Sequence, residues 1–292
     1  MSLISGFEKI VRQGEPLAPH TWLAIGGPAE FLAEPNSADE LAALVRRCRE
    51  LDVPIRLLGG GSNVLVRDAG VPGMVVRLIA PAFTDIFVQD QIVSAGAGAK
   101  LGHVISTAVG EGLAGLESLV GIPGTIGGAL HGNAGTRGGD IGQWTVAATV
   151  MNRAGELQQR TRGELVFAYR QSSLDDLVIL NAQFQLERDD PAELTKRMQK
   201  QWIVRKAAQP MGHQSSGCIF KNPRGMSAGM LIEQTGLTGL RVGGASVSDR
   251  HANYMIADPG TSSDDVLQLI QQVQARVHER LGIELELEIE VW

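Results

Sequence analysis

A cysteine in a glycine-rich segment, followed closely by a lysine and an asparagine, is the group in this sequence best suited to chemistry. Cys218 lies in the run Gly-His-Gln-Ser-Ser-Gly-Cys-Ile-Phe-Lys-Asn-Pro over residues 212–223, with Lys221 and Asn222 just behind it. A lysine and an amide side chain can hold an anionic ligand that also carries amide groups. Beside such a ligand the thiol could be a proton donor or a nucleophile, and it could also be a small buried hydrophobic residue.

Two glycine-rich loops form a second feature with chemical meaning. The first covers residues 59–63 (Gly-Gly-Gly-Ser-Asn) after a short apolar run, and the second covers residues 121–129. Glycines let backbone N–H groups converge on phosphate oxygens. The first loop is neither a Walker loop nor a Rossmann fingerprint, and on its own it could be a tight hairpin turn. Together the loops suit one long ligand with a pyrophosphate and a flat ring, such as a flavin dinucleotide, although the second could also be a crossover packed on a sheet.

Other charged residues are less specific. Arg170 follows Tyr169 where a loop meets a strand, and its planar fork matches a carboxylate, although a surface salt bridge would be the favoured explanation if Arg170 stood alone. Four glutamates alternate near the C-terminus and so share one face of a strand, and spacing alone does not choose among them; they are Glu284, Glu286, Glu288 and Glu290. The six histidines show no metal-binding spacing, so no metal is predicted.

Composition argues against several classes of protein. The chain has 292 residues and 26 Lys and Arg against 32 Asp and Glu, a net charge of −6 that argues against nucleic-acid and anionic-membrane partners. Its two cysteines, Cys48 and Cys218, do not make a disulfide framework, which is typical of a reducing compartment. No apolar run approaches a membrane span, and the N-terminus lacks the layout of a signal peptide. We therefore expect a cytoplasmic protein.

The elements that must position these residues read as mixed strands and helices. Residues 36–52 predict a helix with Ser37 as its cap, followed by strands at 54–58, 64–66 and after Gly73, the start of a β-α-β unit. Residues 112–142 are predicted to be a long structured loop that lines a ligand, rather than a regular element. The other predicted elements are a hairpin over 84–100, strands at 145–151, 157–160, 177–186 and 245–257, helices at 101–111, 192–208, 227–235 and 263–281, and a last strand at 283–291.

Seven motifs, taken in order, resemble those of one enzyme family. They are His20-Thr-Trp-Leu-Ala-Ile-Gly-Gly-Pro28, Leu58-Gly-Gly-Gly-Ser-Asn-Val-Leu65, Gly121-Ile-Pro-Gly-Thr-Ile-Gly-Gly-Ala129, Tyr169-Arg170, Ser216-Gly-Cys-Ile-Phe-Lys-Asn-Pro223, Gly243-Gly-Ala-Ser-Val-Ser248 and His251-Ala-Asn253. They resemble the UDP-N-acetylenolpyruvoylglucosamine reductases of bacterial peptidoglycan synthesis, the MurB family. With only two tyrosines, Tyr169 and Tyr254, the chain is similar to the family's shorter subtype.

The resemblance implies an α+β fold. It predicts a two-subdomain FAD-binding module of the vanillyl-alcohol-oxidase type over residues 1–75 and 76–189, then a C-terminal α+β substrate-binding domain over 190–292. It also implies an oxidoreductase in which NADPH reduces FAD and the flavin N5 passes hydride to the enolpyruvyl group of a UDP-sugar. Protonation of C2 then gives UDP-N-acetylmuramate for the cell wall. We expect the UDP-sugar and NADPH as partners and a monomer as the working unit.

The resemblance also assigns roles to residues. Arg170, Cys218 and Glu288 would be catalytic, Glu288 being selected by the family's C-terminal pattern. Substrate would be bound by Tyr169, Lys221 and Asn222, with His251 a weaker candidate. The residues implied in FAD binding are Gly59, Gly60, Gly61, Ser62, Asn63, Val64, Leu65, Gly121, Ile122, Pro123, Gly124, Thr125 and Gly127.

The sequence departs from the family pattern at two positions. Cys218 replaces the family's usual proton-donating serine, and Leu287 replaces a proline before the glutamate. A thiol, with an ordinary pKa of about 8.5, gives up a proton near neutral pH far more readily than an alkanol. Ser215 or Ser216 could donate instead if Cys218 were a passive core residue. Two other functions remain open, a flavin-dependent oxidase of an alcohol or 2-hydroxy acid and a catalytically silent flavin- or nucleotide-sugar-binding protein.

Overall fold

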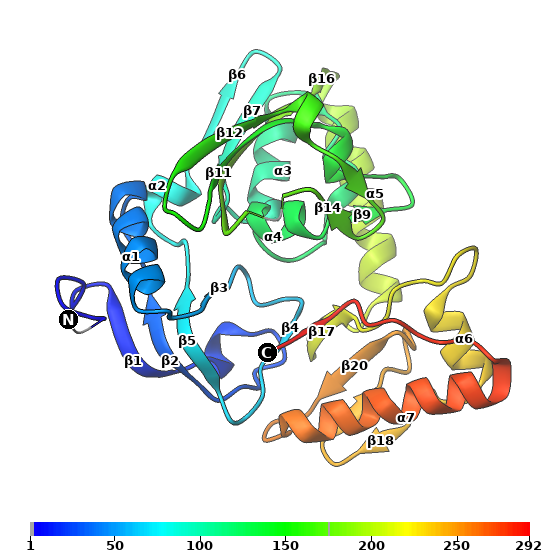
Figure 1. Ribbon diagram of the computed structural model, residues 1–292. Helices are drawn as coiled ribbons and strands as arrows, with labels where there is room; N and C mark the ends of the chain where they lie inside the picture. The colour runs from blue at the N-terminus through cyan, green and yellow to red at the C-terminus, as the bar shows by residue number, and fades with distance from the viewer. Residues whose placement is uncertain (1–2, 175) are drawn as a thin grey trace. The chain divides into compact units, whose positions relative to one another are not determined.

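The structure, a computed structural model, describes residues 3–174 and 176–292 and divides into two compact units (Figure 1). The first unit comprises Met1–Gln13, Glu30–Gly60 and Pro72–Ile203, and the second comprises Gly14–Ala29, Gly61–Val71 and Val204–Trp292. Each unit is therefore assembled from segments that are distant in the sequence. The predicted boundaries after residues 75 and 189 stay predictions.

The β-α-β start is confirmed. Helix α1 (Ala38–Glu50) begins at Ser37, whose side chain accepts a hydrogen bond from the Glu40 N–H at 3.2 Å, and it buries an apolar face that includes Leu44 and Cys48. The helix connects strands of a four-stranded sheet with the order β1-β2-β5-β3, in which β3 and β5 run parallel. Its strands are β1 (Val11–Pro16), β2 (Pro28–Ala33), β5 (Val71–Val76) and β3 (Ile55–Leu57).

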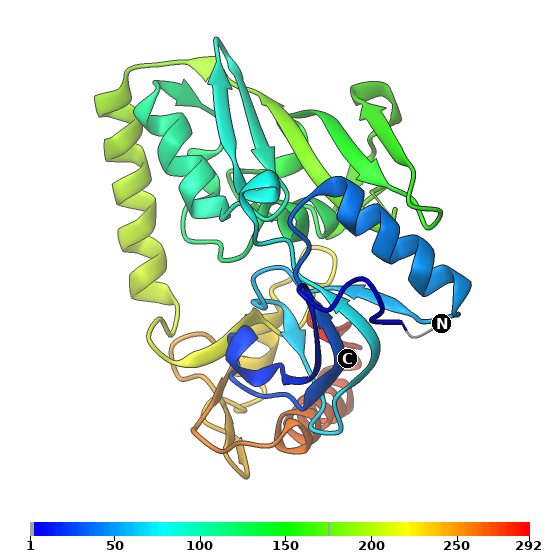
Figure 2. The ribbon, with the colours of Figure 1, turned by 90° about the vertical axis from the view of Figure 1, so that its left-hand side faces the viewer.

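An antiparallel five-stranded sheet forms the rest of the first unit. Its order is β12-β11-β15-β7-β6, and it contains the predicted hairpin of β6 (Ile86–Gln89) and β7 (Ile92–Gly96). The other strands are β11 (Thr145–Met151), β12 (Leu157–Thr161) and β15 (Val178–Gln185). Helices α3 (Leu101–Gly110) and α5 (Pro191–Ala208) lie beside each other (Figures 1 and 2) and contribute Leu101, Val104 and Leu194 to one buried cluster.

The prediction that residues 112–142 contain no regular element is wrong in part. Helix α4 (Ile126–His131) begins where the Thr125 side chain accepts a hydrogen bond from Gly128 N–H, which offsets the weak helix propensity of its glycines. The segment also contains β8 (Leu113–Ala114), β9 (Gly135–Thr136), β10 (Gly139–Asp140) and the 3₁₀ turns Glu117–Leu119 and Ile141–Gln143. Other short elements are α2 (Pro81–Thr84), β13 (Phe167–Ala168), β14 (Gln171–Ser172), β16 (Glu187–Arg188) and the 3₁₀ turns Ala18–His20 and Arg162–Glu164.

The second unit is a small antiparallel sheet with two helices. The sheet has the order β17-β20-β19-β18, and the bounds of its strands are Gln214–Cys218 (β17), Tyr254–Ala257 (β20), Ala245–Val247 (β19) and Arg241–Val242 (β18). Helix α6 (Ala228–Gln234), predicted over 227–235, begins after Ser227, whose side chain caps it, and α7 (Ser263–Leu281) begins after Ser262. Both helices add apolar side chains to one buried cluster that also contains Phe220. The single strand predicted over 245–257 is instead two strands, β19 and β20.

The predicted last strand, residues 283–291, is only partly formed. A ladder exists at β21 (Glu290–Val291), which pairs in parallel with β4 (Val64–Leu65). Before it, the N–H groups of Glu288 and Ile289 both donate to the carbonyl of Ile219, so that the regular alternation of strand hydrogen bonds is lost. Of the helices within residues 3–174 and 176–292, none is both long and apolar enough to cross a membrane.

Candidate active site

The two predicted cofactor loops approach each other inside the first unit. Gly59 and Gly60 follow β3, and a Cβ atom added to Gly60 would lie 2.8 Å from the Cα of Gly124. A Cβ atom on Gly59 would lie 2.7 Å from Oγ1 of Thr125. Any side chain at Gly60 would therefore push the loops apart. The strip between them is lined by partly accessible backbone, which is the environment that a phosphate-bearing cofactor requires.

The second loop is anchored by its backbone. Leu101 N–H donates to the carbonyl of Gly124 at 3.0 Å, and Gly127 N–H donates to the carbonyl of Ala97 at 2.8 Å. These bonds attach the predicted segment Gly121–Gly127 to the end of β7 and the start of α3. The segment, which includes Ile122 and Pro123, is half-buried apart from the fully buried Ile126.

The rest of the first loop, from Gly61 to Leu65, belongs to the second unit. Gly61 has a φ of +64°, and a Cβ atom there would lie 2.0 Å from the His20 carbonyl oxygen. The side chains of Val64 and Leu65 are buried, so that only their backbone could contact a cofactor. Asn63 donates its side-chain N–H to the carbonyl of Glu288 at 2.9 Å. The loop is thus joined to the segment that carries a predicted catalytic carboxylate.

Cys218 and Glu288 are brought together in the second unit. Cys218 ends β17, and Glu288 N–H donates to the carbonyl of the next residue, Ile219, at 2.8 Å. Cys218 is directly opposite Tyr254 in the β17–β20 ladder and hydrogen-bonds with its side chain. Burial raises the pKa of Tyr254 most, and the nearby Cys218 and Glu288 raise it further, whereas Arg205 lowers it. The thiol, the phenol and the carboxylate therefore lie within electrostatic reach of one another.

Lys221 and Asn222 occupy the turn after Phe220. Lys221 N–H donates to the carbonyl of Glu286 at 2.8 Å, and its ammonium forms an ion pair with the Glu286 carboxylate. Because the Glu286 side chain is 73% exposed, the pair is weakly held and an anionic ligand can compete for the lysine. Asn222 accepts a hydrogen bond from Ala228 N–H at 2.9 Å, which ties the turn to α6.

His251 contacts this group through Tyr254. Their ring centroids are 4.9 Å apart with an edge-to-face angle of 65°. Burial lowers the pKa of His251, and its Nδ1 accepts a hydrogen bond from Asn253 N–H at 3.3 Å. Both observations favour a neutral imidazole, which suits a structural neighbour of Tyr254 more than a cation that binds phosphate.

Tyr169 and Arg170 belong to the first unit, in the turn between β13 and β14. Arg170 has a φ of +56°, an uncommon conformation for a residue with a side chain, and it donates to the carbonyl of Gly135 at 3.4 Å. The Arg170 guanidinium carbon lies 5.5 Å from the centroid of the exposed Tyr169 ring. The turn is braced by buried Asn133, which donates to the carbonyl of Ala168 at 2.9 Å.

Sequence reasoning assigned no role to three residues that support the site. Asn133 braces the Arg170 turn, and Tyr254 contacts Cys218. Asn253 is buried and binds both backbone groups of Phe220, at 3.0 Å to its N–H and 2.8 Å to its carbonyl. The run His251-Ala-Asn253 was noted as a motif, so that a signal for Asn253 was present. Its partner, 33 residues away, was not readable from the sequence.

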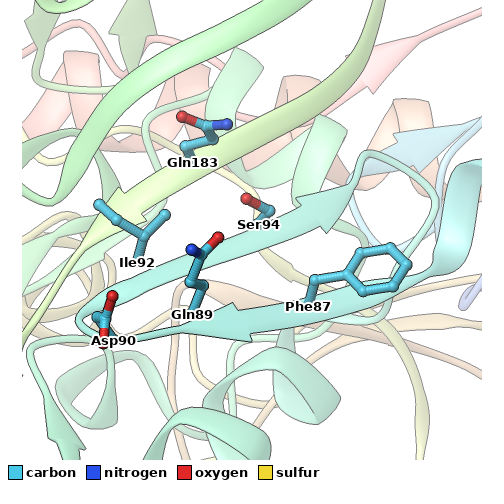
Figure 3. Close-up of a pocket in the computed structure, with 6 residues that line it drawn as sticks. All are labelled: Phe87, Gln89, Asp90, Ile92, Ser94 and Gln183. Carbon is cyan, nitrogen blue, oxygen red and sulfur yellow. The ribbon is translucent and has the colours of Figure 1, made fainter.

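A hollow elsewhere on the first unit does not involve the predicted residues. Figure 3 shows its lining on β6, β7 and β15, which consists of Phe87, Gln89, Asp90, Ile92, Ser94 and Gln183. Phe87 is 65% exposed there. This hollow contains none of the residues predicted to bind FAD or substrate, although Asp90 and Ser94 lie in its lining.

Comparison with known proteins decides the family. Residues 209–292 match the C-terminal domain of UDP-N-acetylenolpyruvoylglucosamine reductase, and residues 29–160 match an FAD binding domain. The reductase of Rhodopirellula baltica is 44% identical over 97% of this chain and 93% of its own length. That of Bradyrhizobium sp. is 42% identical over 94% of this chain and 90% of its own length. The chain belongs to the UDP-N-acetylenolpyruvoylglucosamine reductase family.

A solved reductase structure agrees. The crystal structure of UDP-N-acetylenolpyruvylglucosamine reductase (MurB) from Thermus caldophilus is similar with a TM-score of 0.82 and 38% identity, covering 97% of this chain and 98% of that one. The predicted fold class is confirmed to the extent of an FAD-binding domain followed by the reductase C-terminal domain, in a fold of mixed helices and strands. The chain is an FAD-dependent oxidoreductase, and a flavin-dependent alcohol oxidase is not favoured.

Proposed function

We propose that Cys218 is the proton donor of this reductase. The reaction is the NADPH-dependent reduction of UDP-N-acetylenolpyruvoylglucosamine in peptidoglycan precursor synthesis. Bound FAD, once reduced by NADPH, supplies the hydride that adds to the enolpyruvyl double bond. Cys218 then gives the Sγ proton to C2: the S–H bond breaks, a C–H bond forms, and the electron pair of the S–H bond remains on sulfur.

The observation that carries the proposal is the accessibility of the thiol compared with its neighbours. Ser215 and Ser216 are buried, with 7% and 1% of their surface exposed, whereas Cys218 is only half-buried. A proton donor must reach the substrate carbon, and a buried serine hydroxyl does not. Among residues 3–174 and 176–292, Ser216 is the one whose buried side-chain oxygen has no hydrogen-bond partner.

Glu288 and Arg170 would stabilise the charge that develops on the substrate. Arg170 presents a planar fork that matches the enolpyruvyl carboxylate, and it would neutralise charge that grows as hydride adds. Glu288, in its protonated form, can donate a hydrogen bond to the same enolate-like group. Its main chain is held by the Ile219 carbonyl and by the Asn63 side chain, so that a substitution of the Glu288 side chain leaves both bonds in place.

The remaining predicted residues would bind the two ligands. Backbone N–H groups of Gly59–Leu65 and Gly121–Gly127 would hold the FAD pyrophosphate, with side-chain donors from Ser62, Asn63 and Thr125. Lys221 and Asn222 would contact the UDP-sugar, as would Tyr169 from the turn that carries Arg170. Each role lies on one chain, and we propose a monomer that works in the cytoplasm, where NADPH and nucleotide sugars are available.

Anaerobic half-reactions of the purified protein test the function. NADPH should bleach the flavin absorbance, and subsequent addition of the UDP-sugar enolpyruvyl ether should restore it with release of UDP-N-acetylmuramate, identified by mass. A flavin that NADPH leaves oxidised, but that an alcohol or 2-hydroxy acid bleaches, would contradict the proposal and favour an oxidase.

A further inference from the structure

Tyr254 is the side chain most directly coupled to Cys218. The two residues are Cα partners across the β17–β20 ladder, so that their side chains lie on the same face, and a hydrogen bond connects the thiol and the phenol. The register shifts between Ser215 and Cys218, and Gly217 has a φ of +76°. Such a bulge re-aims the side chain that follows it, here the thiol.

Tyr254 is itself fixed from three directions. Its N–H donates to the carbonyl of His251 at 2.8 Å, and its carbonyl accepts from Ser248 N–H at 2.9 Å. The His251 ring packs edge-to-face against its own ring. The main chain of Tyr254 is thus fixed opposite Cys218, and the ring contact with His251 restrains its side chain.

The surroundings of the Tyr254 phenol determine its protonation state. Burial raises the pKa of Tyr254 above its usual range, and the neighbouring Cys218 and Glu288 add to this, although Arg205 opposes it. The His251 ring favours its neutral form. Tyr254 therefore keeps its proton at neutral pH. When Cys218 becomes a thiolate, the hydroxyl can only donate to it.

We propose that Tyr254 is a positioning residue for Cys218, whose hydroxyl orients the thiol and stabilises the thiolate left after proton transfer. The inference rests on the proposed role of Cys218 as proton donor. A hydrogen bond to the charged form of an acid favours that form. Tyr254 thereby eases the departure of the Sγ proton to C2, and solvent returns a proton to sulfur after product leaves.

Alkylation of the holoenzyme by iodoacetamide measures this effect without turnover. The thiolate is the reactive species, so that the rate at Cys218, followed by peptide mass, gives the pH midpoint of the thiol. In Tyr254→Phe the midpoint should rise by about one pH unit, and the rate at neutral pH should fall on the order of tenfold. Cys48 is fully buried and its pKa is raised to about 11, so it serves as an internal slow-reacting reference.

A matched variant separates a lost hydrogen bond from general loosening. Thr235→Val removes a buried hydroxyl that donates to the carbonyl of Ile232 at 2.8 Å in the same unit, and it should leave the Cys218 midpoint unchanged. Should Tyr254→Phe not fold, 3-fluorotyrosine can be incorporated in a Tyr169→Phe background. Its more acidic phenol should lower the midpoint. An unchanged midpoint in either protein overturns the proposal.

Single-turnover kinetics keep this inference distinct from the role of Cys218. Tyr254→Phe should slow product formation and leave flavin reduction by NADPH unchanged. Product formation by Cys218→Ala at the rate of the unmodified enzyme would remove the proton-donor role whatever Tyr254 does. If Cys218→Ala is inactive and Tyr254→Phe leaves the pH midpoint of Cys218 alkylation unchanged, only the inference about Tyr254 is contradicted.

Discussion

The N–H of Glu288 donates a hydrogen bond to the carbonyl of Ile219, with 2.8 Å between nitrogen and oxygen. Ile219 directly follows Cys218, and the carbonyl of Glu288 in turn accepts from the Asn63 side chain at 2.9 Å. The segments that carry the Glu288 carboxylate, the Cys218 thiol and the first glycine-rich loop are therefore joined by one main-chain hydrogen bond and one from the Asn63 side chain. Side-chain substitutions at Cys218 or Glu288 can change the chemistry while this frame stays intact.

We predict that flavin retention depends on the absence of a side chain at Gly60. Gly60→Ala would place a Cβ atom 2.8 Å from the Cα of Gly124 and force the two loops apart. We expect the purified variant to have a lower ratio of flavin to protein absorbance. Gly102→Ala is the control, because its position on α3 has nothing within 4 Å of the added Cβ and alanine favours a helix. Full flavin content in Gly60→Ala would contradict the assignment of these loops.

Asn253 should be a main determinant of stability around the site. Asn253→Ala would leave both backbone groups of buried Phe220 unsatisfied, at a cost of about 2–4 kcal/mol in the free energy of unfolding. Denaturant unfolding measures the loss. The matched control is Asn36→Ala, whose exposed side chain donates to Glu40 at 3.1 Å and should contribute less than about 1 kcal/mol. If Asn253→Ala and Asn36→Ala lower the free energy of unfolding equally, the two hydrogen bonds between Asn253 and Phe220 do not contribute to stability as predicted.

Stability should fall in acid because of His251. Burial lowers its pKa in the folded protein, so that the unfolded chain takes up a proton first. The stabilisation by neutral His251 is complete above the pKa of the unfolded chain, about 6.5. It is lost progressively as the pH falls below that value, and the loss levels off below the lowered pKa of the folded protein. Protonation would also remove the Nδ1 acceptor used by Asn253 N–H. His251→Gln should flatten this part of the stability profile, whereas substitution of the exposed His103 should not.

Local parts of this fold were predictable, and non-local ones were not. The Ser37, Ser227 and Ser262 caps lie next to the helices they begin, so the helices were predicted within a few residues. The parallel pairing of β4 with β21 joins Val64 to Glu290, and no local pattern signals it. The segment with the alternating glutamates does not form the whole predicted strand, because the N–H groups of Glu288 and Ile289 both donate to the carbonyl of Ile219. Ile219 is distant in the sequence, so this pairing could not be predicted locally.

The residues of the candidate site also divide into those that a local pattern could identify and those that only a distant pairing brings together. The glycine loops and the Cys-x-x-Lys-Asn run could be recognised from residue types alone. The choice of Glu288 from four alternating glutamates came from the family pattern. In the structure it is half-buried, whereas Glu284, Glu286 and Glu290 are exposed. Tyr254 could not be found from sequence, because its relation to Cys218 is a register across two strands 36 residues apart.

The most direct test of Cys218 is a comparison of two variants under anaerobic single turnover. Cys218→Ala should still let NADPH bleach the flavin but should form product at least about 10²-fold more slowly, since general acid catalysis typically contributes that much or more. Cys218→Ser should restore product formation, because the hydroxyl can carry the same proton. Loss of flavin reduction in Cys218→Ala, or product formation at the rate of the unmodified enzyme, would contradict the proton-donor role.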